Sequence, residues 1–167
     1  MRKRRKLRLT GDLYNALLNY AFRLLSRRDY SESELLKKLE VRVKLLEISA
    51  TVASEAIPKV FARLKDLRYL DDQKFAKRFL ESRAAISPRG KFFLKFEMKN
   101  KGIPEAIFEK LWEEGGYSEE DLARKLLEQK RRLFSRFSKE SQKKKAFSLL
   151  SSHGFSLDTI YSIMDGL

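Results

Sequence analysis

Apolar side chains recur at every third or fourth position along most of the chain, with charged and polar side chains between them. This period is that of amphipathic α-helices. In the central stretch 69–112, Asp71 is predicted to cap one helix, and Ser87-Pro88 to begin a second. Gly102 is predicted to end the second helix, and Pro104 to open a third. The stretch therefore predicts one complete three-helix unit.

The same short pattern marks four predicted helix starts: an apolar residue, a capping residue, three further residues and a second apolar residue. The capping residues are Ser31, Asp71, Ser118 and Ser156. Longer segments match in the same register, which indicates an internal repeat of about 50 residues, as in helical arrays. The predicted fold class is all-α, with three tandem three-helix repeats forming an elongated, curved array.

The repeats divide the chain into four segments. We expect a basic N-terminal arm at 1–11, repeat 1 at 12–68, repeat 2 at 69–116 and repeat 3 at 117–167. Repeat 1 contains an atypical longer segment at 40–56, which has neither Gly nor Pro.

Repeat 1 is predicted to contain helices at 12–28, from Ser31, and from Ile57. The apolar residues of 40–56 either prolong the second helix or pack a second turn of core. The pattern alone leaves both alternatives open.

Repeat 3 is predicted to contain helices from Ser118 to Phe134, at 138–152 and at 156–164. Three acids, Glu119, Glu120 and Asp121, fall in the first turn of the first of these helices. Acids in a first turn offset the positive end of the helix dipole. We interpret them as part of a helix start and not as a catalytic carboxylate cluster.

The composition is that of a globular protein, because 43% of the residues are hydrophobic. The absence of Cys excludes disulfides and thiol chemistry and fits a cytoplasmic location. No apolar run approaches the length of a membrane span, and the basic N-terminus lacks the apolar stretch of a secretory signal. We expect a monomer with no membrane partner.

The net charge of +14 is concentrated in three blocks. Residues 1–8 carry six basic and no acidic side chains, 74–101 carry nine and two, and 122–147 carry ten and two. The intervening stretch 102–121 holds one Lys against seven acids. If the repeats stack, the second and third blocks line up on one face, which is the electrostatic pattern of a polyanion-binding protein.

Residues for catalysis or metal binding are missing from the sequence. His153 is the only His, and its place before Gly154 suits a helix C-terminus, where a cation is favourable. No metal-ligand spacing and no Gly-rich phosphate loop occurs, since Gly115-Gly116 is an isolated break. We therefore expect no enzymatic activity and no cofactor.

Several motifs follow one another in a characteristic order: Ala21–Leu39, Tyr69–Ala76, Lys101-Gly-Ile103 and His153-Gly-Phe-Ser156. Together they resemble the RecX family of regulatory proteins over residues 12–165. Two stretches depart from the family pattern. Residues 40–56 replace a short Gly turn, and Ser87-Pro88-Arg89-Gly90-Lys91 stands where the family places Pro just after Gly.

The resemblance implies an all-helical, non-enzymatic protein that modulates the RecA recombinase in DNA repair. Family members bind along the filament of RecA on single-stranded DNA, and usually inhibit strand exchange, ATP hydrolysis and co-protease activity. The family has no catalytic residues to assign here.

Charge position suggests which side chains contact the DNA or the RecA filament, with the second and third blocks supplying non-specific, salt-sensitive attraction. The candidates are Arg4, Arg5, Arg78, Arg83, Arg89, Lys91, Lys95, Lys130, Arg131, Arg132, Arg136, Lys143, Lys144 and Lys145. If the array is curved, it fits the filament groove, where it touches both protein and phosphates.

Two alternatives use the same basic surface. A general nucleic-acid-binding architectural protein would act by coating DNA, without recognising RecA. An adaptor for an acidic protein would bind DNA weakly even at low salt.

Overall fold

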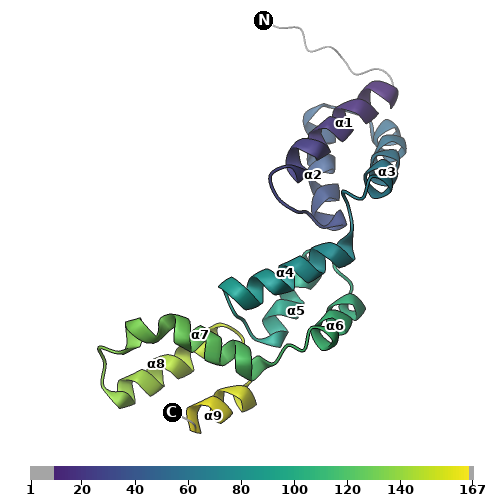
Figure 1. The fold of residues 1–167 in the computed structure, drawn as a ribbon. Coiled ribbons are helices and arrows are strands. Elements are labelled where there is room, and N and C mark those ends of the chain that lie inside the picture. Colours follow the sequence, from purple (N-terminus) through teal and green to yellow (C-terminus); the bar gives the residue numbers. More distant parts are fainter. Residues whose placement is uncertain (1–9, 166–167) are drawn as a thin grey trace, which may run out of the picture. The chain divides into compact units, whose positions relative to one another are not determined.

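The computed structural model describes residues 10–165, shown as a ribbon in Figure 1. This part contains nine α-helices and no strand, which confirms the all-α prediction. They are α1 Thr10–Leu25, α2 Glu32–Leu45, α3 Ala50–Asp66, α4 Asp72–Ile86, α5 Lys91–Asn100, α6 Glu105–Glu114, α7 Glu119–Phe134, α8 Lys139–Ser152 and α9 Leu157–Asp165. The first helix ends at Leu25, three residues before the predicted end at Arg28.

The chain divides into two compact units, Met1–Phe75 and Ala76–Leu167, here called unit 1 and unit 2. In unit 1 the buried residues follow the helical period along α1, α2 and α3, and α1 packs closely against α3. The buried core residues are Leu13, Leu17, Ala21, Leu35, Leu39, Val43, Ala53, Ala56, Val60, Leu64 and Leu70. Spacings of three and four residues place each set on one helix face.

The atypical segment 40–56 is divided between two helices. Helix α2 continues to Leu45, and α3 begins at Ala50, with the Ser49 Oγ accepting from the backbone N–H of Val52 at 3.5 Å. The prediction that the third helix begins at Ile57 is wrong. Pro58 lies inside α3, although a proline supplies no N–H for the helix. Burial of Ala53 and Ala56 in the preceding turn stabilises the helix there.

Unit 2 contains most of α4 and the five later helices, with its own buried core. That core consists of Ala76, Leu80, Leu94, Met98, Ile103, Phe108, Trp112, Leu122, Ala123, Leu126, Ala146, Leu150, Phe155, Ile160 and Ile163. In α7 the fully buried residues are confined to the first half, and in α8 to the second half. The connected ends of these two helices therefore extend beyond the core.

The predicted start of the second helix of repeat 2 at Ser87-Pro88 is also wrong, since α5 begins at Lys91 with Gly90 as its N-cap. The backbone N–H of Gly90 donates to the carbonyl oxygen of His153 at 3.0 Å. A Cβ on Gly90 would overlap the backbone of Gly154. Close packing against the turn between α8 and α9 therefore sets this helix start.

Four predicted N-caps are confirmed by hydrogen bonds to first-turn backbone N–H groups. The Ser31 Oγ accepts from Glu34 as part of a capping box, and the Asp71 Oδ1 accepts from Lys74 at 2.9 Å. Ser118 and Ser156 accept in the same way from the third residue beyond each of them. Local sequence is sufficient to predict these starts.

Candidate functional site

The predicted contact residues lie in three places along the chain. Arg4 and Arg5, in the N-terminal arm, lie outside the described residues. The candidates of the second block belong to α4, α5 and the link between them, and those of the third block to α7, α8 and their connection. Both of these groups belong to unit 2.

Two arginines of the second block share one carboxylate. The Arg83 Nη2 donates to the Glu97 Oε1 at 3.2 Å, and the Arg89 Nη1 lies 3.1 Å from the same oxygen. Only about a third of each arginine side chain is exposed. The pairs therefore connect α4 and its following link to α5, and Arg78 also has a contact within the molecule.

Two lysines of the second block pair with the acids of α6. Lys91 Nζ lies 2.7 Å from Glu109, and Lys95 Nζ lies 3.0 Å from Glu109 and 2.6 Å from Glu105. The hydrogen bond from Lys91 lowers the pKa of Glu109, and the hydrogen bond to Glu105 raises the pKa of Lys95. Both shifts keep the groups charged at neutral pH, so these cations link α5 to α6.

The third block is exposed and less neutralised. Arg132, Arg136 and Lys143 form no ion pair with any residue between 10 and 165, and neither does the half-buried Lys130. Arg131 pairs with Glu128 and Lys144 pairs with Glu140, each within one helix. In both pairs the basic and the acidic side chains are largely exposed. Exposed ion pairs of this kind contribute little to stability, so the cation can exchange its carboxylate partner for another anion.

Lys145 lies over an aromatic ring, with its Nζ 4.3 Å from the ring centroid of Phe137. A hollow of about 490 Å³ beside it is lined by Leu133, Phe134 and Leu149, together with Arg136. Side chains of both α7 and α8 thus combine cations with exposed apolar surface.

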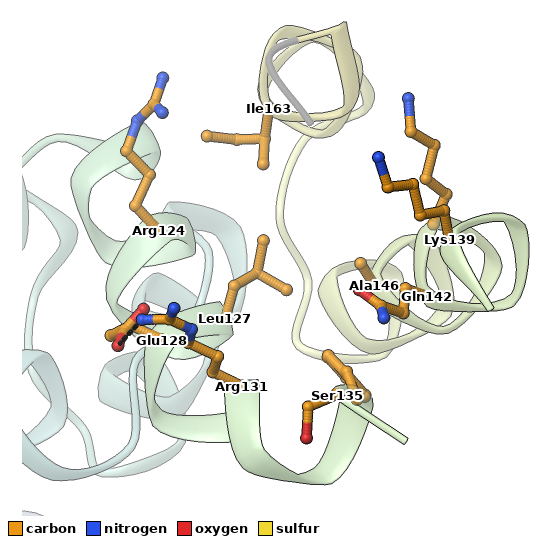
Figure 2. A pocket seen from close by; sticks show the side chains of 11 residues that line it. Arg124, Leu127, Glu128, Arg131, Ser135, Lys139, Gln142, Ala146 and Ile163 are labelled. Carbon is orange, nitrogen blue, oxygen red and sulfur yellow. Dashed lines mark hydrogen bonds and ion pairs between the residues drawn. The ribbon is translucent and has the colours of Figure 1, made fainter. Parts of the chain in front are cut away.

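A larger hollow of about 540 Å³, the α7–α9 groove, is lined by α7, α8 and α9 and by the residue that follows α7 (Figure 2). Its apolar lining comes from Leu127, Phe134, Ala146 and Ile163. Its cationic lining comes from Arg124, Arg131, Lys139 and Lys143, with Glu128 as the one acid among the lining residues.

Sequence reasoning missed the α7–α9 groove, although a signal exists. Helix α9 spans nine residues, against 16 for α7 and 14 for α8. The two long helices therefore extend past the short one, and within residues 10–165 their apolar positions near the connection lack a third helix.

The described residues hold no group of three or more acids, His or Cys that could bind a metal ion. His153 caps α8, and its ring Nδ1 lies 2.9 Å from the carbonyl oxygen of Leu149. That position agrees with the predicted role at a helix C-terminus. Within residues 10–165, no helix has both the length and the apolarity to cross a membrane.

Two family models match the chain. Residues 71–110 match a family described as the second three-helix domain of RecX, and residues 118–164 match the third three-helix domain of RecX. The two matches together span more than half of the 167 residues.

Curated relatives extend the similarity to nearly the whole length. The regulatory protein RecX of Prosthecochloris aestuarii is 32% identical over 150 residues, which are 90% of this chain and 92% of that protein. The regulatory protein RecX of Chlorobaculum tepidum is 32% identical over 146 residues, 87% of this chain and 84% of that protein.

Solved structures agree in fold. The crystal structure of RecX from Lactobacillus salivarius superposes with a TM-score of 0.66 at 25% identity, and covers 94% of this chain and 97% of that one. A second crystal structure, of a regulatory protein RecX, has a TM-score of 0.69 at 18% identity and covers 95% of this chain and 75% of that one.

Proposed function

Because this chain belongs to the RecX family of regulatory proteins, we propose that it regulates the RecA recombinase by binding the filament that RecA forms on single-stranded DNA. The RecX family is one of non-enzymatic regulators, so the action is binding and not catalysis. We further propose that the protein acts as a cytoplasmic monomer that lies in the filament groove. There it inhibits strand exchange, ATP hydrolysis and co-protease activity.

The observation that carries the DNA part of this proposal is the exposed third basic block on α7 and α8. Cations without internal partners can release counterions from a nucleic acid on binding, which favours association and makes it sensitive to salt. We assign the main phosphate contacts to Lys130, Arg131, Arg132, Arg136, Lys143, Lys144 and Lys145.

The second block is assigned a lesser share of the binding. Arg83, Arg89, Lys91 and Lys95 already have carboxylate partners at 3.2 Å or less. A phosphate would have to compete with these carboxylates, so part of the attraction would be lost. Arg78, Arg4 and Arg5 are proposed as additional contacts on the basis of charge.

We also propose that the chain consists of an arm followed by three repeats. The arm is 1–11, and the repeats are 12–68, 69–116 and 117–167. The family matches at 71–110 and 118–164 support the second and third repeats.

The test is ATP hydrolysis by preformed RecA filaments on single-stranded DNA, measured while this protein is added. The titration is repeated with an excess of naked single-stranded DNA as competitor. Inhibition that survives the competitor supports recognition of the filament. If the competitor abolishes inhibition, the protein acts by coating DNA, and the architectural alternative replaces the proposal.

A further inference from the structure

We infer that the α7–α9 groove is a docking site for an acidic amphipathic segment of a protein partner. The groove thus takes protein, whereas the proposed phosphate contacts outside it, at Lys130, Arg132, Arg136, Lys144 and Lys145, take DNA. Arg131 and Lys143 line the groove and belong to both surfaces. The inference rests on the proposed function in one respect, that this segment belongs to the protein of the filament.

Among residues 10–165, the groove has an apolar floor where α7 and α8 extend past α9. Helix α9 contributes Ile163, which Figure 2 shows facing the Leu127 side chain of α7. Phe134 and Ala146 complete the floor. Fully buried positions on α7 end at Leu126, so the floor continues the core of unit 2 to the surface. An open extension of a core favours apolar side chains from outside.

The charge of the groove favours an acidic partner. The groove has four cationic side chains on its rim, and its single carboxylate, Glu128, lies 3.4 Å from Arg131. Lys139 rises from one side of the groove and Arg124 from the other (Figure 2). A partner with apolar residues on one helix face and acids beside them is complementary to this arrangement.

The polar lining residues argue against a small polar ligand. The Ser135 Oγ donates to the carbonyl oxygen of Arg132 at 3.0 Å, and the Gln142 Nε2 donates to that of Phe137 at 2.8 Å. These groups are occupied by the protein's own backbone and do not form the convergent polar set that orients a small molecule.

The floor also argues against a nucleic acid as occupant. Bases bind single-strand proteins by stacking on several exposed aromatic faces, but Phe134 is the one aromatic side chain among the lining residues. The volume of about 540 Å³ lies within the range of ligand pockets, roughly 300–1,000 Å³, and can accept more than one apolar side chain.

The groove is tested by filling it in the full-length chain. Gln142→Trp places a large side chain in the groove, whereas Ser148→Trp places the same side chain on α8 beside the other hollow. The probe is a fluorescein-labelled helical peptide of about 18 residues, with Leu on one face and Glu on the others. A permuted peptide of equal composition, without the Leu face, controls for charge alone. Binding is followed by fluorescence anisotropy, and folding by circular dichroism.

We expect the amphipathic peptide to bind the wild-type chain more tightly than the permuted peptide. Gln142→Trp should weaken that binding by at least about tenfold, roughly the loss of one buried apolar anchor. Ser148→Trp should change it by less than about twofold, and neither variant should weaken binding of oligo(dT). If Gln142→Trp folds poorly, Ser135→Trp serves instead, since Ser135 also lines the groove, is exposed and carries no charge.

Two results would overturn the inference. One is equal affinity of the two peptides, or of wild type and Gln142→Trp for the amphipathic peptide. The other is a loss of oligo(dT) binding as large as the loss of peptide binding, which would make the groove a nucleic-acid site.

The peptide experiment contains neither RecA nor DNA, so it remains informative if the proposed function fails. Whether the acidic segment belongs to RecA is tested separately. The measurement is how strongly the Gln142→Trp protein inhibits ATP hydrolysis by the RecA filament. Inhibition weakened relative to Ser148→Trp supports the link. Unchanged inhibition would show that the acidic segment belongs to another protein.

Discussion

At the scale of single residues, Glu119 joins three helix starts of unit 2. It lies in the first turn of α7, and its carboxylate accepts from the backbone N–H of Lys91 at 2.6 Å. It also accepts from the Ser156 Oγ at 2.7 Å and the Thr159 Oγ1 at 3.0 Å. The starts of α5 and α9 therefore share one acceptor with α7.

Glu119→Ala should lower the free energy of unfolding of unit 2 by about 2–3 kcal/mol, because it removes hydrogen bonds to a charged group and leaves donors unpaired. Urea unfolding followed by the fluorescence of Trp112, which lies in this unit, measures the loss. Glu120→Ala is the control, since Glu120 is exposed, accepts from the Ser162 Oγ at 2.8 Å and lies 3.8 Å from Arg124. Similar losses in the two variants would contradict the role of Glu119.

Position 154 requires glycine for two reasons, its backbone conformation and the side chain packed against it. Its φ of +73° is in the left-handed region, and a Cβ would overlap the ring of Phe93. Gly154→Ala should therefore cost about 3 kcal/mol, a conformational penalty plus a steric one.

Gly116→Ala is the matched control, because its φ of +61° is similar and nothing lies within 4 Å of an added Cβ. It should cost about 1 kcal/mol in the same urea experiment. Equal costs would show that the contact with Phe93 adds nothing.

Asp72 provides a pH prediction for unit 1. Burial raises the pKa of its carboxyl above the ordinary value of 3.8, although the backbone N–H of Glu32 donates to Oδ1 at 2.8 Å. A raised pKa means that the charged form is disfavoured in the folded state. Ionised Asp72 thus lowers stability at neutral pH, and this penalty fades as the pH falls through the raised pKa toward 3.8.

Asp72→Asn keeps an acceptor for Glu32 and removes the charge. The variant should be more stable than wild type at about pH 7, and the difference should close by about pH 3.5. Urea unfolding monitored by circular dichroism at both pH values measures it. A difference that does not change with pH would exclude this titration as its cause.

At the scale of helices, Pro58 is the least favourable residue of α3. It is exposed, and it removes one backbone donor from the helix interior. Pro58→Ala should raise stability by about 1–2 kcal/mol, since the gain in helix propensity exceeds the entropy that the unfolded chain regains. Pro104→Ala, at the N-cap of α6, should give no gain. Urea unfolding of both variants measures these changes in stability. A loss of stability in Pro58→Ala would contradict the conclusion that Pro58 is unfavourable in α3.

The sequence was sufficient where a helix start depends on its own first turn, as at Ser31, Asp71, Ser118 and Ser156. It was insufficient where distant residues decide. Gly90 begins α5 because the turn at Gly154 packs against it, more than 60 positions later. The start of α3 was predicted at Ile57, whereas Ser49 provides the cap and the helix begins at Ala50.

At the scale of the whole molecule, basic side chains that look equivalent in the sequence have different surroundings. Arg83 and Lys95 each find their acids 14 positions away on another helix, which a count of charge along the chain does not reveal. The α7–α9 groove depends on the relative lengths of three helices and was likewise missed. By contrast, the exposure of the third block follows from its place beyond the core.

We propose above that the exposed cations of α7, α8 and their connection form the main DNA-binding surface, and not the cations of α4, α5 and their link, which pair with acids of other helices. We would measure the affinity for oligo(dT) across a range of salt concentrations for two triple variants. One replaces Arg132, Arg136 and Lys143 by Ala, and the other replaces Arg89, Lys91 and Lys95. Both remove three positive charges, so their effects on net charge are the same.

Each phosphate contact on single-stranded DNA contributes about 0.7 to the slope of log affinity against log salt. We expect the first triple variant to flatten this slope by about 2, and the second to flatten it by less than about 0.7. Equal flattening, or a larger effect of the second variant, would contradict the claim that internal ion pairs withhold the second block from DNA.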